Sequence, residues 1–456
     1  MMVQMPRTAR LAVALLGTAV GLAAVVAPVG AGGTTPDDPV FEQGLQWSLT
    51  RIGAPEVWGQ ATGAGVTIAV IDSGVDLTHE DLADKVVAQT SCVGADGDAD
   101  RCQGSAQDDN GHGSHVAGIA LASTGNGRGI AGVAPGADLM AVRVLTNQCD
   151  GGGGCTASGT AADVAAGIRW AVDNGADVIN LSLGGGAVQG ALGCGFCDAV
   201  EYAWSKGAIP VIAAGNDSVL PSGFSDEHAV VVTATTRDDQ RASYSNASSG
   251  LLRNARWPLS APGGEPETTP SDCATGGQPK GVLSAYWVAG SSNEYACLAG
   301  TSMAAPHVAG ALAVLLSLGY SPQGAIDQIL GTAEDLGTPG RDDQFGVGRL
   351  ALARAVGAAP VTTTTPPATA VAPPTTVAPP TTTVPPPTVP GETTTAPTVQ
   401  IPIPAESAAP FVPGSTPDRS PDDPPTWLIG LAVAALLASG TATSATAWRL
   451  AKRDRA

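Results

Sequence analysis

Three short motifs carry the side chains needed for nucleophilic catalysis, and they lie far apart in the chain. Asp72 follows an apolar run, His112 lies in the motif NGHGSHVAG, and Ser302 lies in the motif GTSMAAPH. A serine hydroxyl becomes an effective nucleophile when a neighbouring imidazole takes its proton. A buried carboxylate then orients the imidazole and stabilises its charged form. The motifs therefore predict acyl-transfer chemistry by Asp72, His112 and Ser302.

The same chemistry needs donors for the oxyanion that develops in the transition state. Ser302 lies at an expected helix start, where backbone N–H groups and the helix dipole favour negative charge. Asn216, in the sequence AAGN after an apolar run, can supply a side-chain N–H. Taken alone, Asn216 reads as an ordinary turn residue. Beside the three motifs, we interpret it as the second oxyanion donor.

Strands and helices alternate in the part of the chain that holds these motifs. Residues 66–71, 178–183 and 208–214 read as buried strands, whereas 159–174 and 303–318 have helical periodicity. Buried apolar strands that alternate with helices indicate an α/β fold, a parallel sheet with helices on both faces. Asp72 and Asn216 would then lie at strand ends, and His112 and Ser302 at helix starts.

These motifs resemble those of the subtilisin-like serine proteases, the subtilases, over roughly residues 45–356. The resemblance extends to AVRVL at 141–145, VINLSLGG at 178–185 and FGVGRL at 345–350, and the order Asp, His, Ser is the known order of this family. It implies a subtilisin-like fold and a serine endopeptidase that cuts protein or peptide substrates without a cofactor. It also implies the catalytic roles of Asp72, His112, Ser302 and Asn216.

The resemblance further implies where substrate and calcium would bind. Subtilase substrates add as a strand between two edge segments, which match residues 151–156 and 183–185 here. The expected substrate-binding residues are Gly152, Gly153, Leu183, Gly184, Gly185, Ala214 and Gly215. In some subtilases an Asp at the position of Asp81 helps to bind a structural calcium, and the loop at 126–130 resembles the loop that completes such a site.

Composition divides the rest of the chain into segments. Residues 1–31 have the charged, apolar and small-residue order of a signal peptide, and 32–44 form a short extension before the domain at 45–356. Between residues 361 and 400, 26 of 40 residues are Thr or Pro, so 357–426 reads as a disordered stalk. Residues 427–448 carry no charge and predict a membrane helix, before a basic tail at 449–456.

Charge gives this layout a direction across the membrane. Of the 22 basic and 41 acidic residues, the tail after Trp448 holds 4 basic and 1 acidic, whereas residues 32–448 hold 16 and 40. A basic tail indicates a cytoplasmic C-terminus, with the catalytic domain outside a single-pass cell-membrane anchor. The formal net charge of −19 argues against a nucleic-acid partner. The layout resembles the mycosins, membrane-anchored subtilases of type VII secretion, and so implies secretion-complex partners.

All eight cysteines lie between residues 92 and 297. An even number of cysteines in an exported protein indicates disulfides. Their order suggests four local loops, with the pairs Cys92–Cys102, Cys149–Cys155, Cys194–Cys197 and Cys273–Cys297.

Three functions remain open at this point, the last of them a stalked surface adhesin that rests only on the Thr/Pro-rich segment. The first is a membrane-anchored extracytoplasmic serine endopeptidase that works through an acyl-enzyme. The second is a catalytically inactive subtilase fold that serves as a scaffold of a membrane complex. All four catalytic positions are filled, which favours the enzyme.

Overall fold

The central strand β1 (Thr67–Asp72) shows how the sequence builds a buried sheet. Ile68 and Val70 point into one hydrophobic cluster, and Ala69 and Ile71 point into another. Since successive side chains of a strand alternate between faces, an apolar run of this kind needs cover on both sides. The predicted doubly covered sheet is therefore confirmed at its central strand.

In this computed structural model, the described residues are 36–149, 155–183, 194–218, 224, 226–250, 253–266, 279–357 and 398–401. The predicted signal peptide, membrane helix and basic tail lie outside them, as does the stalk apart from residues 357 and 398–401. Within the described part of the chain, no helix is both long enough and apolar enough to cross a membrane.

The described residues form a seven-stranded sheet in the order β11-β8-β7-β6-β1-β3-β2, and each neighbouring pair is parallel. In β1 and β3, Asp72 lies opposite Arg143. The other six strands are β2 (Val86–Ser91), β3 (Asp138–Arg143), β6 (Val178–Leu181), β7 (Ile209–Ala213), β8 (Val230–Thr235) and β11 (Trp257–Pro262).

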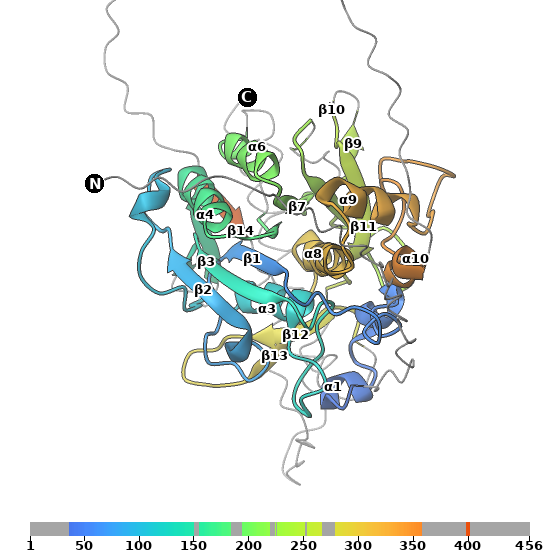
Figure 1. Ribbon diagram of the computed structural model, residues 1–456, viewed down its shortest axis with the longest axis horizontal. Coiled ribbons are helices and arrows are strands. Elements are labelled where there is room, and N and C mark those ends of the chain that lie inside the picture. Colours follow the sequence, from blue (N-terminus) through green and yellow to red (C-terminus); the bar gives the residue numbers. More distant parts are fainter. Residues whose placement is uncertain are drawn as a thin grey trace, which may run out of the picture.

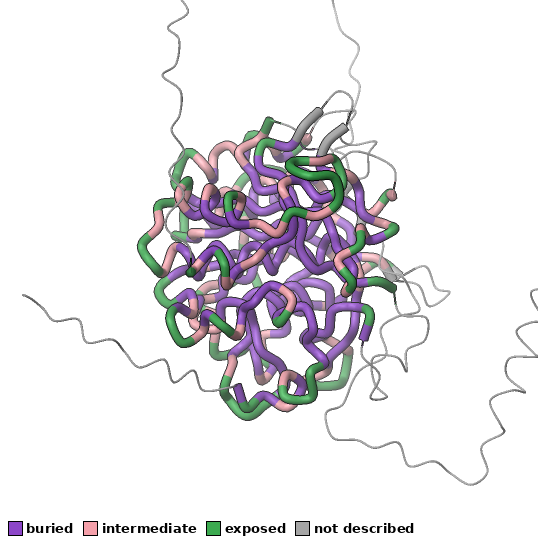
Figure 2. The backbone as a smooth tube through the Cα atoms, turned by 90° about the vertical axis from the view of Figure 1, so that its right-hand side faces the viewer, coloured by how far each residue is buried: buried purple, intermediate pink, exposed green. Residues whose placement is uncertain are grey.

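Helices cover both faces of this sheet (Figure 1). On one face lie α3 (His112–Leu121) and α8 (Thr301–Ser317), whose side chains join the same hydrophobic cluster as Ile68. On the other face lie α4 (Ala161–Asp173) and α6 (Cys197–Ser205). Figure 2 shows the buried residues in the interior and the exposed ones along the surface loops.

Shorter elements surround this core. The strands β4 (Thr146–Cys149) and β5 (Cys155–Thr160) form a small sheet with β14 (Thr398–Ile401). The remaining elements are α1 (Pro39–Glu42), α2 (Trp47–Ile52), η1 (Ala83–Lys85), η2 (Ala99–Arg101), β9 (Ser249–Gly250), β10 (Arg253–Asn254), β12 (Val282–Tyr286), β13 (Glu294–Leu298), α9 (Pro322–Gly331) and α10 (Leu352–Gly357).

Strand order places the candidate site. The chain moves from β1 to β2 and β3 on one side and then to β6, β7 and β8 on the other, so the order reverses at β1. Open α/β sheets bind ligands beyond the carboxyl ends of the strands at such a reversal. Asp72 is the last residue of β1, and Ser182 and Ala214 directly follow β6 and β7.

Candidate active site

Asp72 and His112 meet at the carboxyl edge of the sheet. Both are buried, with exposed fractions of 0% and 3%. His112 Nδ1 lies 2.8 Å from Asp72 Oδ1, and that oxygen also accepts the backbone N–H of Ser73 at 2.7 Å. The carboxylate therefore fixes the imidazole through Nδ1 and leaves Nε2 for proton transfer.

A glycine allows this close approach. A Cβ atom on Gly113 would lie 2.0 Å from the carbonyl oxygen of Gly74 and 3.1 Å from Asp72 Cβ. A side chain at this position would therefore force the start of α3 away from the end of β1. Glycine is thus needed for the contact between Asp72 and His112.

The surroundings of His112 change its basicity. Burial by itself lowers the pKa of the imidazole, but the charge of Asp72, the hydrogen bond to Asp72 and the charge of Asp108 outweigh it. The net result is a pKa above the ordinary value of 6.5. A general base with such a pKa accepts a proton more readily than a free histidine.

Asp108 positions the loop that leads to His112, and the sequence analysis missed it. One carboxylate oxygen accepts the N–H groups of Asn110 and Gly111 and the hydroxyl of Ser73, all within 3.0 Å. The other accepts the N–H and the hydroxyl of Ser114, at 3.0 and 2.6 Å. Asp108 thereby joins the loop after β1 to the first turn of α3. An Asp before a helix start is a signal for such capping.

Ser302 lies in the first turn of α8, and Ser182 holds its backbone. Proline has no N–H, so Pro306 leaves the Ser302 carbonyl without a donor four residues along the helix. The Ser182 hydroxyl donates to that carbonyl oxygen at 2.8 Å. In return, the Ser302 hydroxyl donates to the Ser182 carbonyl oxygen at 3.1 Å. These contacts tie the start of α8 to the end of β6.

Asn216 is held in one orientation by Thr301. Its Oδ1 accepts both the N–H and the hydroxyl of Thr301 at 2.9 Å, and the same hydroxyl accepts the N–H of Gly215 at 3.1 Å. With Oδ1 occupied, the NH₂ end of Asn216 faces Gly300. Its Nδ2 lies 3.4 Å from the position that a Cβ atom on Gly300 would take. The structure thus brings a side-chain donor beside the residues that precede Ser302.

Comparison with known proteins identifies the family that carries this arrangement. The profile described as the Subtilase family matches residues 63–348, which is more than half of the chain. The chain belongs to the subtilase family. This match lies within the predicted domain at 45–356 and confirms the resemblance seen in the three motifs.

Individual relatives agree with the family assignment. The chain is 37% identical to "Thermitase" of Thermoactinomyces vulgaris, over 71% of this chain and 99% of that protein. It is 36% identical to "Subtilisin Savinase" of Lederbergia lenta, over 60% of this chain and 84% of that protein. A solved protease structure from Pseudoalteromonas arctica matches with a TM-score of 0.55 and 30% identity. The match covers 71% of this chain and 99% of that one. This subtilase is therefore a serine endopeptidase.

The structure describes three of the seven predicted substrate-binding residues of the subtilase. Leu183 and Ala214 are buried beyond the ends of the neighbouring strands β6 and β7, and Gly215 follows with a φ of 103°. Their place beside Asn216 suits a substrate pocket. The roles of the other four stay a prediction, since Gly152, Gly153, Gly184 and Gly185 lie outside the described residues.

Asp81 is buried beside a second carboxylate that the sequence analysis missed. Asp81 accepts hydrogen bonds from Asn126 Nδ2, the Ile130 N–H and the Tyr295 hydroxyl. Asp38, also buried, accepts the N–H groups at 125 and 126 of the same loop. Burial raises the pKa of both groups, and the charge of Asp81 raises the pKa of Asp38 further. In the described ranges, no Lys or Arg forms an ion pair with either carboxylate.

The two remaining histidines of the motif helices, His115 and His307, are structural. His115 Nε2 lies 3.0 Å from the carbonyl oxygens of Val282 and Ala296, and burial lowers its pKa to about 3. His307 Nδ1 lies 2.8 Å from the Met303 carbonyl, and burial lowers its pKa to about 4. Both rings therefore stay neutral at neutral pH and fasten their helices.

Two predicted disulfides are confirmed, Cys92–Cys102 and Cys194–Cys197. Cys149 and Cys155 oppose each other in the β4–β5 ladder, as their predicted pairing requires. Cys297 is disulfide-bonded, and its predicted partner Cys273 lies outside the described residues.

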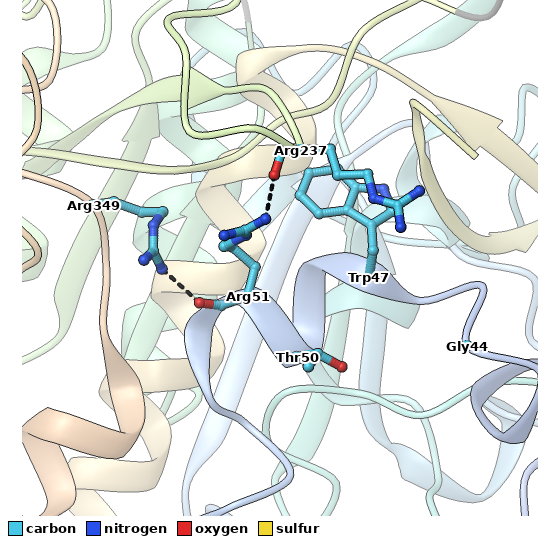
Figure 3. A pocket seen from close by; sticks show the side chains of 6 residues that line it. All are labelled: Gly44, Trp47, Thr50, Arg51, Arg237 and Arg349. Carbon is cyan, nitrogen blue, oxygen red and sulfur yellow. Dashed lines mark hydrogen bonds between the residues drawn. The ribbon is translucent and has the colours of Figure 1, made fainter. Parts of the chain in front are cut away.

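A pocket of about 370 Å³ lies apart from these residues, beside α2 (Figure 3). Its polar lining includes Arg51, Arg237 and Arg349. Asp239 pairs with Arg51 at 3.1 Å and with Arg349 at 2.8 Å. Arg51 and Arg349 also donate to backbone carbonyl oxygens. These contacts join α2 to the loop after β8 and to the C-terminal part of the domain.

Proposed function

We propose that Asp72, His112 and Ser302 are the catalytic triad of this subtilase and that Asn216 is its oxyanion donor. The observation that supports this most is the buried 2.8 Å contact between His112 and Asp72 at the start of α3. Helix α8, which begins beside Ser302, packs directly against α3. The reaction is hydrolysis of a peptide bond in a protein or peptide.

The proposed mechanism has two steps. His112 Nε2 takes the proton of the Ser302 hydroxyl while the oxygen attacks the scissile carbonyl, and the proton then passes to the leaving amine. Water, activated by the same imidazole, releases the acyl group from Ser302. The Asn216 amide and the backbone N–H of Ser302 stabilise the negative oxygen in both steps. Asp72 stabilises the imidazolium that forms in between.

A fluorophosphonate probe tests this proposal, because it reacts only with an activated serine. We expect the intact protein to be labelled and the Ser302→Ala variant not to be labelled. The Ser317→Ala variant, changed at the far end of α8, should be labelled like the wild type. Absence of labelling in the well-folded wild type would favour the inactive scaffold instead.

A structural calcium beside Asp81 is part of the proposal. Two buried carboxylates, Asp38 and Asp81, supply hard oxygen donors, which suit Ca²⁺. Within the described residues, no group of three or more His, Cys, Asp or Glu side chains could hold a metal. A cation held between Asp38 and Asp81 would offset the repulsion between the two carboxylates, without a part in the chemistry.

We also propose that the protease domain lies outside the cell membrane on a Thr/Pro-rich stalk, as in the mycosins. The uncharged segment 427–448 and the basic tail after it support this topology. Cell fractionation tests it, since a chain that ends at residue 426 should leave the membrane fraction. A secretion-complex partner would be recovered with the full chain after cross-linking. If both chains fractionate alike, the anchor is not residues 427–448.

A further inference from the structure

A short segment of the predicted stalk lies as a strand against the protease domain. Strand β14 (Thr398–Ile401) pairs antiparallel with β5 at the outer edge of a three-stranded sheet. Val399 lies opposite Gly159, and Ile401 lies opposite Ala157. In Figure 1, β14 is the red strand beside α4. The 40 residues from 358 to 397 connect it to the end of the domain, which is ample length for this return.

The sequence explains why this segment can pair while its neighbours cannot. Thr398, Val399 and Ile401 have side chains that favour strands. Pro397 and Pro402 flank them, and a proline cannot donate a hydrogen bond to a ladder. The strand is therefore limited to the four residues between the two prolines.

The sheet that holds β14 is fastened to the catalytic residues. Directly before β4, the N–H of Val144 donates to the backbone carbonyl of Asp72 at 2.8 Å. Asn147 of β4 accepts a hydrogen bond from Asn110 Nδ2 at 3.0 Å. Asn110 lies two residues before His112. A chain that pairs with β5 therefore lies on a sheet anchored to both Asp72 and the loop of His112.

We infer that Thr398–Ile401 is a blocking strand. It pairs with residues 157–160 of β5, directly after the substrate edge predicted at 151–156. The other edge of β5 pairs with β4, so a substrate strand that extends along β5 must use the edge that β14 occupies. This inference rests on the proposed function. The edge groups of β5 can serve only one partner strand at a time, so β14 and a β-augmenting substrate exclude each other. Because the competitor belongs to the same chain as β5, its effective concentration does not depend on the protein concentration and is on the order of millimolar.

The test is a double substitution in the full chain, Val399→Pro with Gln400→Pro. In an antiparallel pair, the backbone N–H groups of alternate residues point toward the partner strand. One of two consecutive prolines therefore always removes an N–H that would bond to β5. We expect the KM for an unstructured peptide substrate to fall about three- to tenfold, with kcat unchanged, as the free edge becomes fully available. The matched control, Thr376→Pro with Val377→Pro in the same stalk, should keep the wild-type KM.

A peptide of residues 396–402 added in trans gives the second measurement. It should compete with the substrate of the Val399→Pro, Gln400→Pro variant, whether or not it is cut, and the same peptide with both prolines should not compete. An unchanged KM together with no competition would overturn the inference. A wild type that neither cuts peptides nor reacts with the fluorophosphonate would instead overturn the proposed function.

Discussion

At the residue scale, the basicity of His112 depends on Asp72. The carboxylate outweighs the effect of burial and holds the imidazole pKa above 6.5. Protonated His112 cannot accept the proton of Ser302, so the proposed mechanism needs the neutral ring. Activity should therefore be lost as the pH falls through this raised pKa and be retained above it.

Replacement of Asp72 by Asn tests this dependence. We expect kcat to fall about 10⁴-fold, as is typical for a triad carboxylate. The residual kcat/KM should show its acidic limb at a lower pH. Burial still lowers the His112 pKa, and of the groups that raise it only the charge of Asp108 remains. Profiles of kcat/KM against pH measure both effects. An Asp100→Asn variant on the exposed acidic loop is the control, and an unmoved acidic limb in Asp72→Asn would contradict the argument.

The sequence predicted Asp72, His112, Ser302 and Asn216 because each lies in a local motif with a recognisable neighbourhood. It did not predict Asp108, Ser182 or Thr301. Ser182 and Thr301 act through partners distant in the chain, since 120 residues separate Ser182 from Ser302 and 85 separate Thr301 from Asn216. Asp108 binds mostly nearby residues, but its contact with Ser73 spans 35 residues. Polar residues of this kind look like ordinary turn or cap residues until the fold is known. Three-dimensional contact, and not residue type, distinguishes them.

At the element scale, two reciprocal hydrogen bonds between Ser182 and Ser302 join helix α8 to the end of strand β6. Ser182 satisfies the Ser302 carbonyl that Pro306 leaves without a helical donor, and it accepts a hydrogen bond from Asn180 Nδ2 at 2.9 Å. A buried carbonyl without a donor costs about 1–3 kcal/mol. The proposed nucleophile is therefore positioned by a contact between elements as well as by its own helix.

The Ser182→Ala variant should show this cost. We expect the free energy of unfolding to fall by about 1–3 kcal/mol, together with a lower kcat, because Ser302 loses its backbone anchor. Urea unfolding and peptide hydrolysis measure the two effects. Ser317→Ala, near the exposed end of α8, should change stability by at most about 0.5 kcal/mol. If both variants unfold alike, the contact does not stabilise the site.

The main strands and helices were predicted well, since their apolar periodicity is strong. The expected strand at 178–183 ends at Leu181, and the expected helix at 159–174 begins at Ala161. Both differences arise at ends, where the residues leave the ladder or cap the helix. The pairing of β14 with β5 could not be predicted, because a Thr/Pro-rich segment has no periodicity that reveals a distant partner.

At the scale of the whole molecule, the N-terminal extension contributes to the proposed calcium site. Asp38 brings a second buried carboxylate to Asp81 from a position 43 residues earlier in the chain. A cation would bind only when this extension is docked. Binding therefore stabilises the folded domain over the unfolded chain.

Chelation should accordingly lower the melting temperature. At calcium 100-fold above Kd, binding contributes about 2.7 kcal/mol. For a domain of about 300 residues, Tm in EDTA should then fall by about 4 °C. The Asp38→Asn and Asp81→Asn variants should lose this response, whereas Asp96→Asn in the acidic loop should keep it. Calorimetry of calcium binding is the independent check. An identical Tm in EDTA and calcium, with no heat of binding, would rule the site out.

The spacing of the catalytic residues along the chain also affects how this protease is made. Asp72 and His112 are 40 residues apart, and Ser302 pairs with a residue 120 positions before it. A chain that emerges from the ribosome presents its nucleophile last. Partly synthesised copies therefore contain the base without the serine, and they cannot cut one another. If Ser302 is the nucleophile, proteolytic activity therefore requires a chain that is complete at least to the start of α8.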